Sequence, residues 1–128
     1  MKVLLDTHVL LWFHASDPRL SRNALATIEA KENECWYSLV SLWEIAIKYN
    51  LGKLKLADDL PNTFRAMDGS NLNRLSLTSD QVLEVAALPL HHRDPFDRML
   101  IAQAKHEGMH LLTVDPHFGA YDVQLINV

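Results

Sequence analysis

Cysteine is almost absent from this sequence, with Cys35 its only example among 128 residues. One cysteine cannot form an internal disulfide, which excludes a small secreted domain held together by such bonds. Cys35 falls in a segment expected to be a buried strand, so an inert thiol is predicted. No apolar run approaches the roughly 18 residues that a membrane-spanning helix needs. Asp6 and His8 also interrupt the apolar N-terminus before it could serve as a secretory signal. We therefore expect a cytoplasmic protein without a membrane span.

An excess of positive charge is also missing, since the formal net charge is −4. Proteins that coat nucleic acid through bulk electrostatics are usually strongly basic, and this class is disfavoured. An enzyme that meets phosphate through bound cations stays compatible, because the cations reverse the local charge. What the sequence does contain, 48% hydrophobic and 22% charged residues, is typical of a globular protein. We expect residues 1–128 to form a single domain with its own core.

Short apolar segments alternate with amphipathic segments along the chain. Strands are predicted at 2–5, 35–38, 72–77, 110–114 and 123–126, and helices at 22–31, 39–49, 59–67, 78–88 and 94–107. This alternation predicts an α/β fold with a parallel sheet covered on both faces. Ligands of such sheets bind beyond the carboxyl ends of the strands.

Local signals set several of these boundaries and faces. Ser21 is expected to cap the helix at 22–31, with Leu25 and Ile28 facing inward. Thr78 and Gln81 have the spacing of a capping box. Asp94 followed by Pro95 predicts a helix start, and Gly52 and Gly108 predict helix ends. The inward face of the helix at 39–49 is expected to consist of Leu42, Ile45, Ala46 and Tyr49.

Four acidic residues are expected to meet at one edge of the predicted sheet. Asp6 and Asp115 end two strands, and Glu44 lies early in the helix that follows another. Asp97 lies in the first turn of a helix that must run antiparallel to the strand it feeds. Its N-terminus therefore lies over the carboxyl edge of that strand.

Each acid also has an ordinary structural explanation. Asp6 and Asp115 suit turns after strands, and Asp97 suits the positive end of a helix dipole. Glu44 could complete a capping box with Ser41 or pair with Lys48 one turn later. Placed together, however, four carboxylates repel one another unless a cation neutralises them. Oxygen ligands suit Mg²⁺ or Mn²⁺, and such an ion can activate water and offset charge on a phosphate.

Four motifs in order resemble the PIN-domain nucleases, and most closely the VapC-like toxins of bacterial toxin–antitoxin pairs. They are LLDTHVLLW from Leu4, SLWEI from Ser41, DPFDRMLIA from Asp94 and LTVDPHF from Leu112. The resemblance extends from Met1 to about Tyr121. Many members have asparagine where this chain has His8, but other members share the histidine. We expect His8 to pack or cap locally rather than to bind metal.

The resemblance implies a three-layer α/β sandwich with a central parallel sheet. It implies endoribonuclease activity that depends on Mg²⁺ or Mn²⁺, a homodimer, and an antitoxin protein that blocks the site. By position it assigns catalysis and metal binding to Asp6, Glu44, Asp97 and Asp115, with Thr113 as a nearby polar support.

Other interpretations stay open at this point. Arg93 and Arg98 could contact RNA phosphates, although solvated surface charge explains them equally well. Asp94 is sufficiently explained as a helix cap, and the tryptophans as core or interface residues. Two further functions compete with the ribonuclease: a metal-dependent phosphohydrolase of small phosphoesters, and a catalytically inactive PIN-like binding module.

Overall fold

Five short parallel strands form one sheet in the order β3-β2-β1-β4-β5. The computed structural model describes residues 1–91, 94–121 and 125–127. The strands are β1 (Lys2–Leu5), β2 (Glu34–Ser38), β3 (Asn73–Leu75), β4 (His110–Thr113) and β5 (Leu125–Asn127). The predicted parallel sheet is thus confirmed. For the predicted fifth strand, residues 123 and 124 lie outside the described residues.

Helices connect the strands, and most of them begin at a side-chain cap. They are α1 (Thr7–His14), α2 (Arg22–Glu29), α3 (Leu39–Asn50), α4 (Leu60–Asp68), α5 (Ser79–Ala87) and α6 (Pro95–Glu107), with a short 3-10 helix η1 (Pro116–Ala120). Ser21 caps α2, and Thr78 with Gln81 forms the predicted capping box of α5. Helix α6 ends at Gly108, whose φ of 66° is the left-handed conformation that favours glycine.

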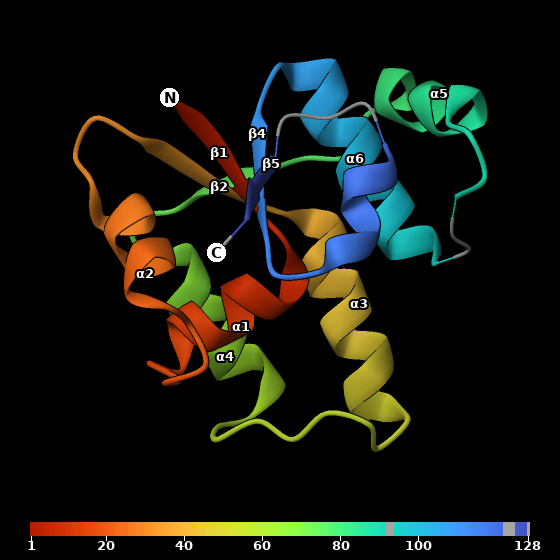
Figure 1. Cartoon of the computed structure of the whole chain (residues 1–128). Coiled ribbons are helices and arrows are strands. Elements are labelled where there is room, and N and C mark those ends of the chain that lie inside the picture. The colour runs from red at the N-terminus through yellow and green to blue at the C-terminus, as the bar shows by residue number, and fades with distance from the viewer. Residues whose placement is uncertain (92–93, 122–124, 128) are drawn as a thin grey trace.

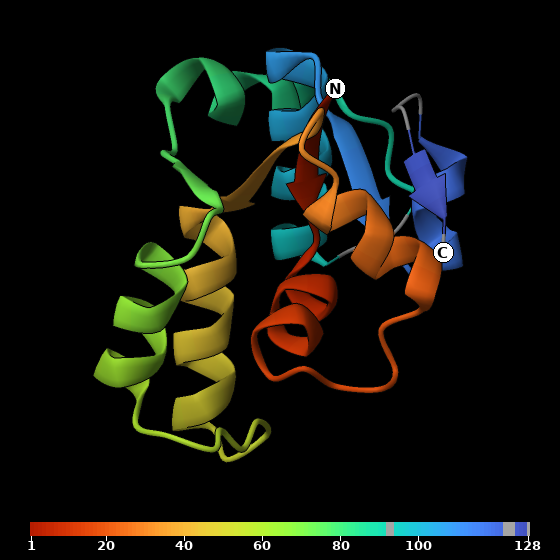
Figure 2. The same ribbon diagram turned by 90° about the vertical axis from the view of Figure 1, so that its left-hand side faces the viewer.

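The helices cover both faces of the sheet and give three layers (Figures 1 and 2). Alternate strand residues face opposite sides, as the pleat requires. Val3 and Leu5 join the core beneath α1, α2 and α4, whereas Leu4 joins the core beneath α5 and α6. Helix α3 contributes to both cores. This is the expected three-layer α/β sandwich.

Two predicted helix faces need correction. Leu25 is exposed, and Ala24 takes its place beside Ile28, because residues four apart share one face of a helix. Tyr49 is also exposed on the last turn of α3, whereas Leu42 and Ile45 are buried as predicted.

Cys35 is buried in β2, and burial raises the pKa of its thiol, in agreement with an inert cysteine. Across the described ranges, no helix has the length and apolar character needed to cross a membrane.

Candidate active site

Asp6 lies where β1 passes into α1, at the carboxyl edge of the sheet. One carboxylate oxygen accepts the backbone N–H of Val9 at 2.9 Å and so caps α1. The other accepts a short hydrogen bond from the hydroxyl of Thr113, the last residue of β4. Burial raises the pKa of Asp6, although the hydrogen bonds from Thr113 and Val9 oppose this rise. Two hydrogen bonds thus fix the orientation of this carboxylate.

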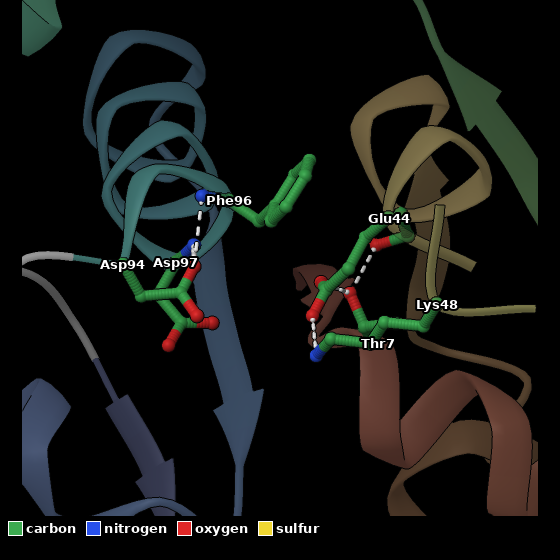
Figure 3. A network of polar contacts seen from close by, with 7 residues as sticks. Thr7, Glu44, Lys48, Asp94, Phe96 and Asp97 are labelled. Atoms are coloured by element: carbon green, nitrogen blue, oxygen red, sulfur yellow. Dashed lines mark hydrogen bonds and ion pairs between the residues drawn. The ribbon is translucent and has the colours of Figure 1, made fainter. Parts of the chain in front are cut away.

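Glu44 lies in the second turn of α3 and is only 2% exposed. One carboxylate oxygen accepts a hydrogen bond of 2.7 Å from the Thr7 hydroxyl, and the other lies 2.5 Å from the Lys48 ammonium. Figure 3 shows the carboxylate between these two partners. The predicted pairing with Lys48 is confirmed. The predicted capping box with Ser41 is wrong, because Ser38 caps α3 and Ser41 lies inside the first turn.

Asp97 lies in the first turn of α6, facing the other acids. Asp94 caps this helix by accepting the backbone N–H groups of Phe96 and Asp97, as Figure 3 shows. The pKa of Asp97 is raised to about 7, first by burial and then by the carboxylates of Asp94, Glu44, Asp115 and Asp6. The Asp97 carboxyl group therefore interacts electrostatically with every other acid of the predicted cluster.

Asp115 follows β4 and caps η1. Its carboxylate accepts the backbone N–H of His117 at 2.9 Å and lies 2.8 Å from Nδ1 of the same histidine. Its own backbone N–H donates to the Thr113 hydroxyl at 3.0 Å. Thr113 therefore connects the ends of β1 and β4 and holds Asp6 and Asp115 in one network.

The four acids share one edge of the sheet without converging on a single point. Among the described residues, no three acidic, histidine or cysteine side chains lie close enough to bind one ion as they stand. Three of the carboxylates have basic or hydroxyl partners instead: Thr113 for Asp6, Lys48 for Glu44, and His117 for Asp115. The donor set itself consists of hard oxygen atoms, which suits Mg²⁺ or Mn²⁺. Burial first, and then the neighbouring carboxylates, raise the pKa of Asp97. The residues thus fit a divalent cation chemically, provided that some of these side-chain partners move.

A cavity of about 540 Å³ opens beside Glu44, between α1, α3 and the segment that leads into α4. Leu11, Trp12 and Leu54 form part of its apolar wall, and Lys53 and Lys55 add positive charge. Glu44, the one acid of the predicted cluster that lines this cavity, therefore borders a space that could admit part of a larger substrate.

His8 is exposed, and among the described residues it belongs to no group of three potential metal ligands. Its ring lies 6.0 Å from that of Trp12, centroid to centroid, and its charge lowers the pKa of Asp6 slightly against the effect of burial. This agrees with the expectation that His8 packs locally.

Arg98 is not available for RNA. It is 8% exposed, and its guanidinium donates to the carbonyl oxygens of Val85, Leu88 and Pro89 and to the hydroxyl of Tyr121. The proposed phosphate contact for Arg98 is therefore wrong: this side chain anchors the segment after α5 to α6. Arg93 lies outside the described residues.

Sequence reasoning overlooked Thr7 and Ser41 as part of the site. The Thr7 hydroxyl contacts both Glu44 and the Ser41 hydroxyl, the latter at 2.9 Å. No local signal joins residues so far apart in the sequence. The only indication was that Thr7 directly follows Asp6 at the end of a strand.

Fold and site together define an α/β protein with a carboxylate cluster at the carboxyl edge of a parallel sheet. The PIN domain family model matches residues 3–124. The chain belongs to the PIN-domain family.

Individual relatives agree with this assignment. The chain is 30% identical over 114 residues to Ribonuclease VapC22 of Mycobacterium tuberculosis, covering 88% of this chain and 86% of the relative. Its fold is similar to a chain of VapBC2 from Rickettsia felis bound to a promoter DNA fragment, with a TM-score of 0.74 at 19% identity, covering 99% of this chain and 98% of the other. VapBC-5 from Mycobacterium tuberculosis, a member of the VapBC family of toxin–antitoxin systems, gives a TM-score of 0.64 at 19% identity, covering 99% and 98%.

Proposed function

We propose that this chain is a metal-dependent endoribonuclease and the toxin of a toxin–antitoxin pair. The observation that carries this proposal is the placement of four acids at the carboxyl edge of the sheet, two of which, Asp6 and Glu44, are buried. Burial and the neighbouring carboxylates also raise the pKa of Asp97. Such a concentration of partly buried negative charge is unfavourable for the protein unless a cation binds there. Membership of the PIN-domain family and similarity to a protein named as a ribonuclease support the same activity.

The proposed ligands of the cation are Asp6, Glu44, Asp97 and Asp115, and the proposed ion is Mg²⁺ or Mn²⁺. When bound, the ion activates water for attack on the phosphodiester and offsets negative charge on the phosphate oxygens. Thr113 keeps the Asp6 carboxylate in a fixed orientation through its hydroxyl. An ion held by these carboxylates would offer the phosphate oxygens a local positive partner, so a chain with a net charge of −4 could act on RNA.

Exposed apolar side chains on α3 and α5 support a homodimer. Leu39 and Trp43 on α3 and Val82 and Leu83 on α5 are exposed, and both helices pack on α6. Apolar groups gathered on neighbouring surface helices are typical of protein interfaces. We infer that two copies of the chain meet through this surface.

An antitoxin is the second proposed protein partner. The similar structures from Rickettsia felis and Mycobacterium tuberculosis are of VapBC proteins, which pair a toxin with an antitoxin. Such a partner would keep the nuclease inactive until it is removed. We place this activity in the cytoplasm, since RNA substrates are found there.

The test uses labelled single-stranded and folded RNAs with the purified protein in Mg²⁺, in Mn²⁺ and in a chelator. Asp97→Asn serves as the site variant, and Asp80→Asn, an exposed first-turn acid of α5, serves as the matched control. We expect cleavage that requires metal, disappears in Asp97→Asn and persists in Asp80→Asn. Cleavage by Asp97→Asn at the wild-type rate would overturn the assignment of this site. Hydrolysis of a generic small phosphoester with no effect on any RNA would instead identify a phosphohydrolase.

A further inference from the structure

The Lys48 ammonium forms an ion pair with the buried carboxylate of Glu44. Its nitrogen is 2.5 Å from one oxygen of Glu44, while the other oxygen is bonded to Thr7. Glu44 is only 2% exposed, so Lys48 is its principal source of neutralising charge in the described structure. Both oxygens of Glu44 are thus occupied before any cation arrives.

The Lys48 side chain also extends beyond its own helix. In Figure 3 the side chain extends from α3 toward the side of the site where Asp94 and Asp97 lie. The ammonium thus pairs with Glu44 at the end of a side chain that points toward α6.

We propose that Lys48 is a built-in counter-ion that holds the metal site in a closed, metal-free state and must leave Glu44 before a divalent cation binds. This inference rests on the proposed function only in taking the acid cluster as the metal site. A bound divalent cation and an ammonium at the same carboxylate repel each other, so the two compete for Glu44. Lys48 is only partly buried, and its flexible chain can turn toward solvent at small cost.

This competition accounts for the orientation of Glu44 and contributes to the lack of a formed ligand set. The acids share an edge of the sheet, yet no three potential ligands within the described ranges converge on one point. Glu44 is turned to Lys48 and Thr7, and releasing Lys48 would free one of its oxygens. Lys48 would therefore stabilise the metal-free protein and lower the affinity of the protein for metal.

The experiment measures Mn²⁺ affinity by calorimetry, without RNA, for the wild type, Lys48→Met and Lys48→Arg. Lys31→Met is the matched control, because it removes one exposed lysine before β2, at the opposite edge of the sheet. We expect Lys48→Met to bind Mn²⁺ about tenfold more tightly, equivalent to about 1.4 kcal/mol. Lys48→Arg, which keeps the charge, and Lys31→Met should stay within about threefold of the wild type.

A second measurement separates this role from simple support of Glu44. Unfolding by urea, with and without Mn²⁺, should show that Lys48→Met is less stable than the wild type without metal and gains more stability when metal is added. In a Glu44→Gln background, the effect of Lys48→Met on Mn²⁺ affinity should largely disappear, because the two residues are coupled.

The outcomes distinguish the two proposals. Weaker or unchanged Mn²⁺ binding by Lys48→Met, relative to Lys31→Met, would overturn the counter-ion role and identify Lys48 as a positioning residue or as surface charge. If the wild type bound no Mn²⁺ and Lys48→Met bound none either, the metal site itself would fail, and the proposed function with it.

Discussion

Replacing Asp97 with asparagine should make the metal-free protein more stable while it removes catalysis. The pKa of this carboxyl rises from its ordinary value of 3.8 to about 7, so its ionised form is disfavoured in the folded state. A rise of this size corresponds to at most about 4 kcal/mol. Partial exposure and the favourable N-terminus of α6 reduce the effect, and we expect about 2 kcal/mol.

The pH dependence gives the sign of this effect. In the unfolded chain Asp97 ionises near pH 3.8, whereas in the folded protein it ionises near pH 7. The destabilisation of the folded state by the Asp97 charge is therefore absent below about pH 4, grows between pH 4 and 7, and is complete above pH 7. At pH 8 in chelator, the free energy of unfolding of Asp97→Asn should exceed that of the wild type by about 2 kcal/mol, which raises the melting temperature by roughly 8 °C. Near pH 4 the two proteins should be equally stable.

Urea and thermal unfolding at several pH values provide the assay, and Asp80→Asn provides the control. Asp80 is exposed in the first turn of α5, where its charge should favour the helix, so its replacement should cost a few tenths of a kcal/mol. If Asp97→Asn destabilised the metal-free protein at pH 8, or if its effect did not change between pH 4 and 8, Asp97 would be an ordinary helix-terminal acid. The reasoning about accumulated negative charge would then be wrong.

Three further variants test other parts of the structure. Thr113→Val removes the hydroxyl that donates to Asp6 and should lower metal-free stability by about 2 kcal/mol in urea and slow RNA cleavage; unchanged cleavage would contradict its supporting role. Arg98→Met leaves buried carbonyl oxygens without their donor and should cost about 3 kcal/mol in the same assay, whereas a surface arginine would cost almost nothing. Leu83→Glu should convert the proposed dimer to a monomer in analytical ultracentrifugation; an unchanged oligomer would move the interface elsewhere.

Much of the fold could be predicted because its boundaries are set by local chemistry. Asp94 and Pro95 begin α6, and the left-handed Gly108 ends it, and both signals are visible in sequence. The same cap and proline signal at Asp115 and Pro116 begins η1, which was overlooked because a short 3-10 helix has no apolar periodicity. Leu25 was misplaced because hydrophobicity alone does not decide which side of a short helix faces the core.

The site was predictable where contacts are local or follow from strand ends. The pairing of Glu44 with Lys48 needs only helical spacing, and the shared edge of Asp6 and Asp115 needs only a parallel sheet. The hydroxyl of Thr7 reaches both Glu44 and the Ser41 hydroxyl across the fold, so no pattern along the chain reveals these contacts. Arg98 has the sequence neighbourhood of a site residue, and only tertiary packing shows that its donors are directed to loop carbonyls.

We propose that the carboxylates at this edge of the sheet bind a catalytic divalent cation. Anomalous diffraction from crystals grown with Mn²⁺ tests it most directly, because it locates the ion without reference to activity. We expect a manganese peak about 2.1 Å from oxygen atoms of at least two of the four acids, with Lys48 turned away from Glu44. Manganese bound elsewhere, or no peak at an Mn²⁺ concentration that supports RNA cleavage, would contradict it.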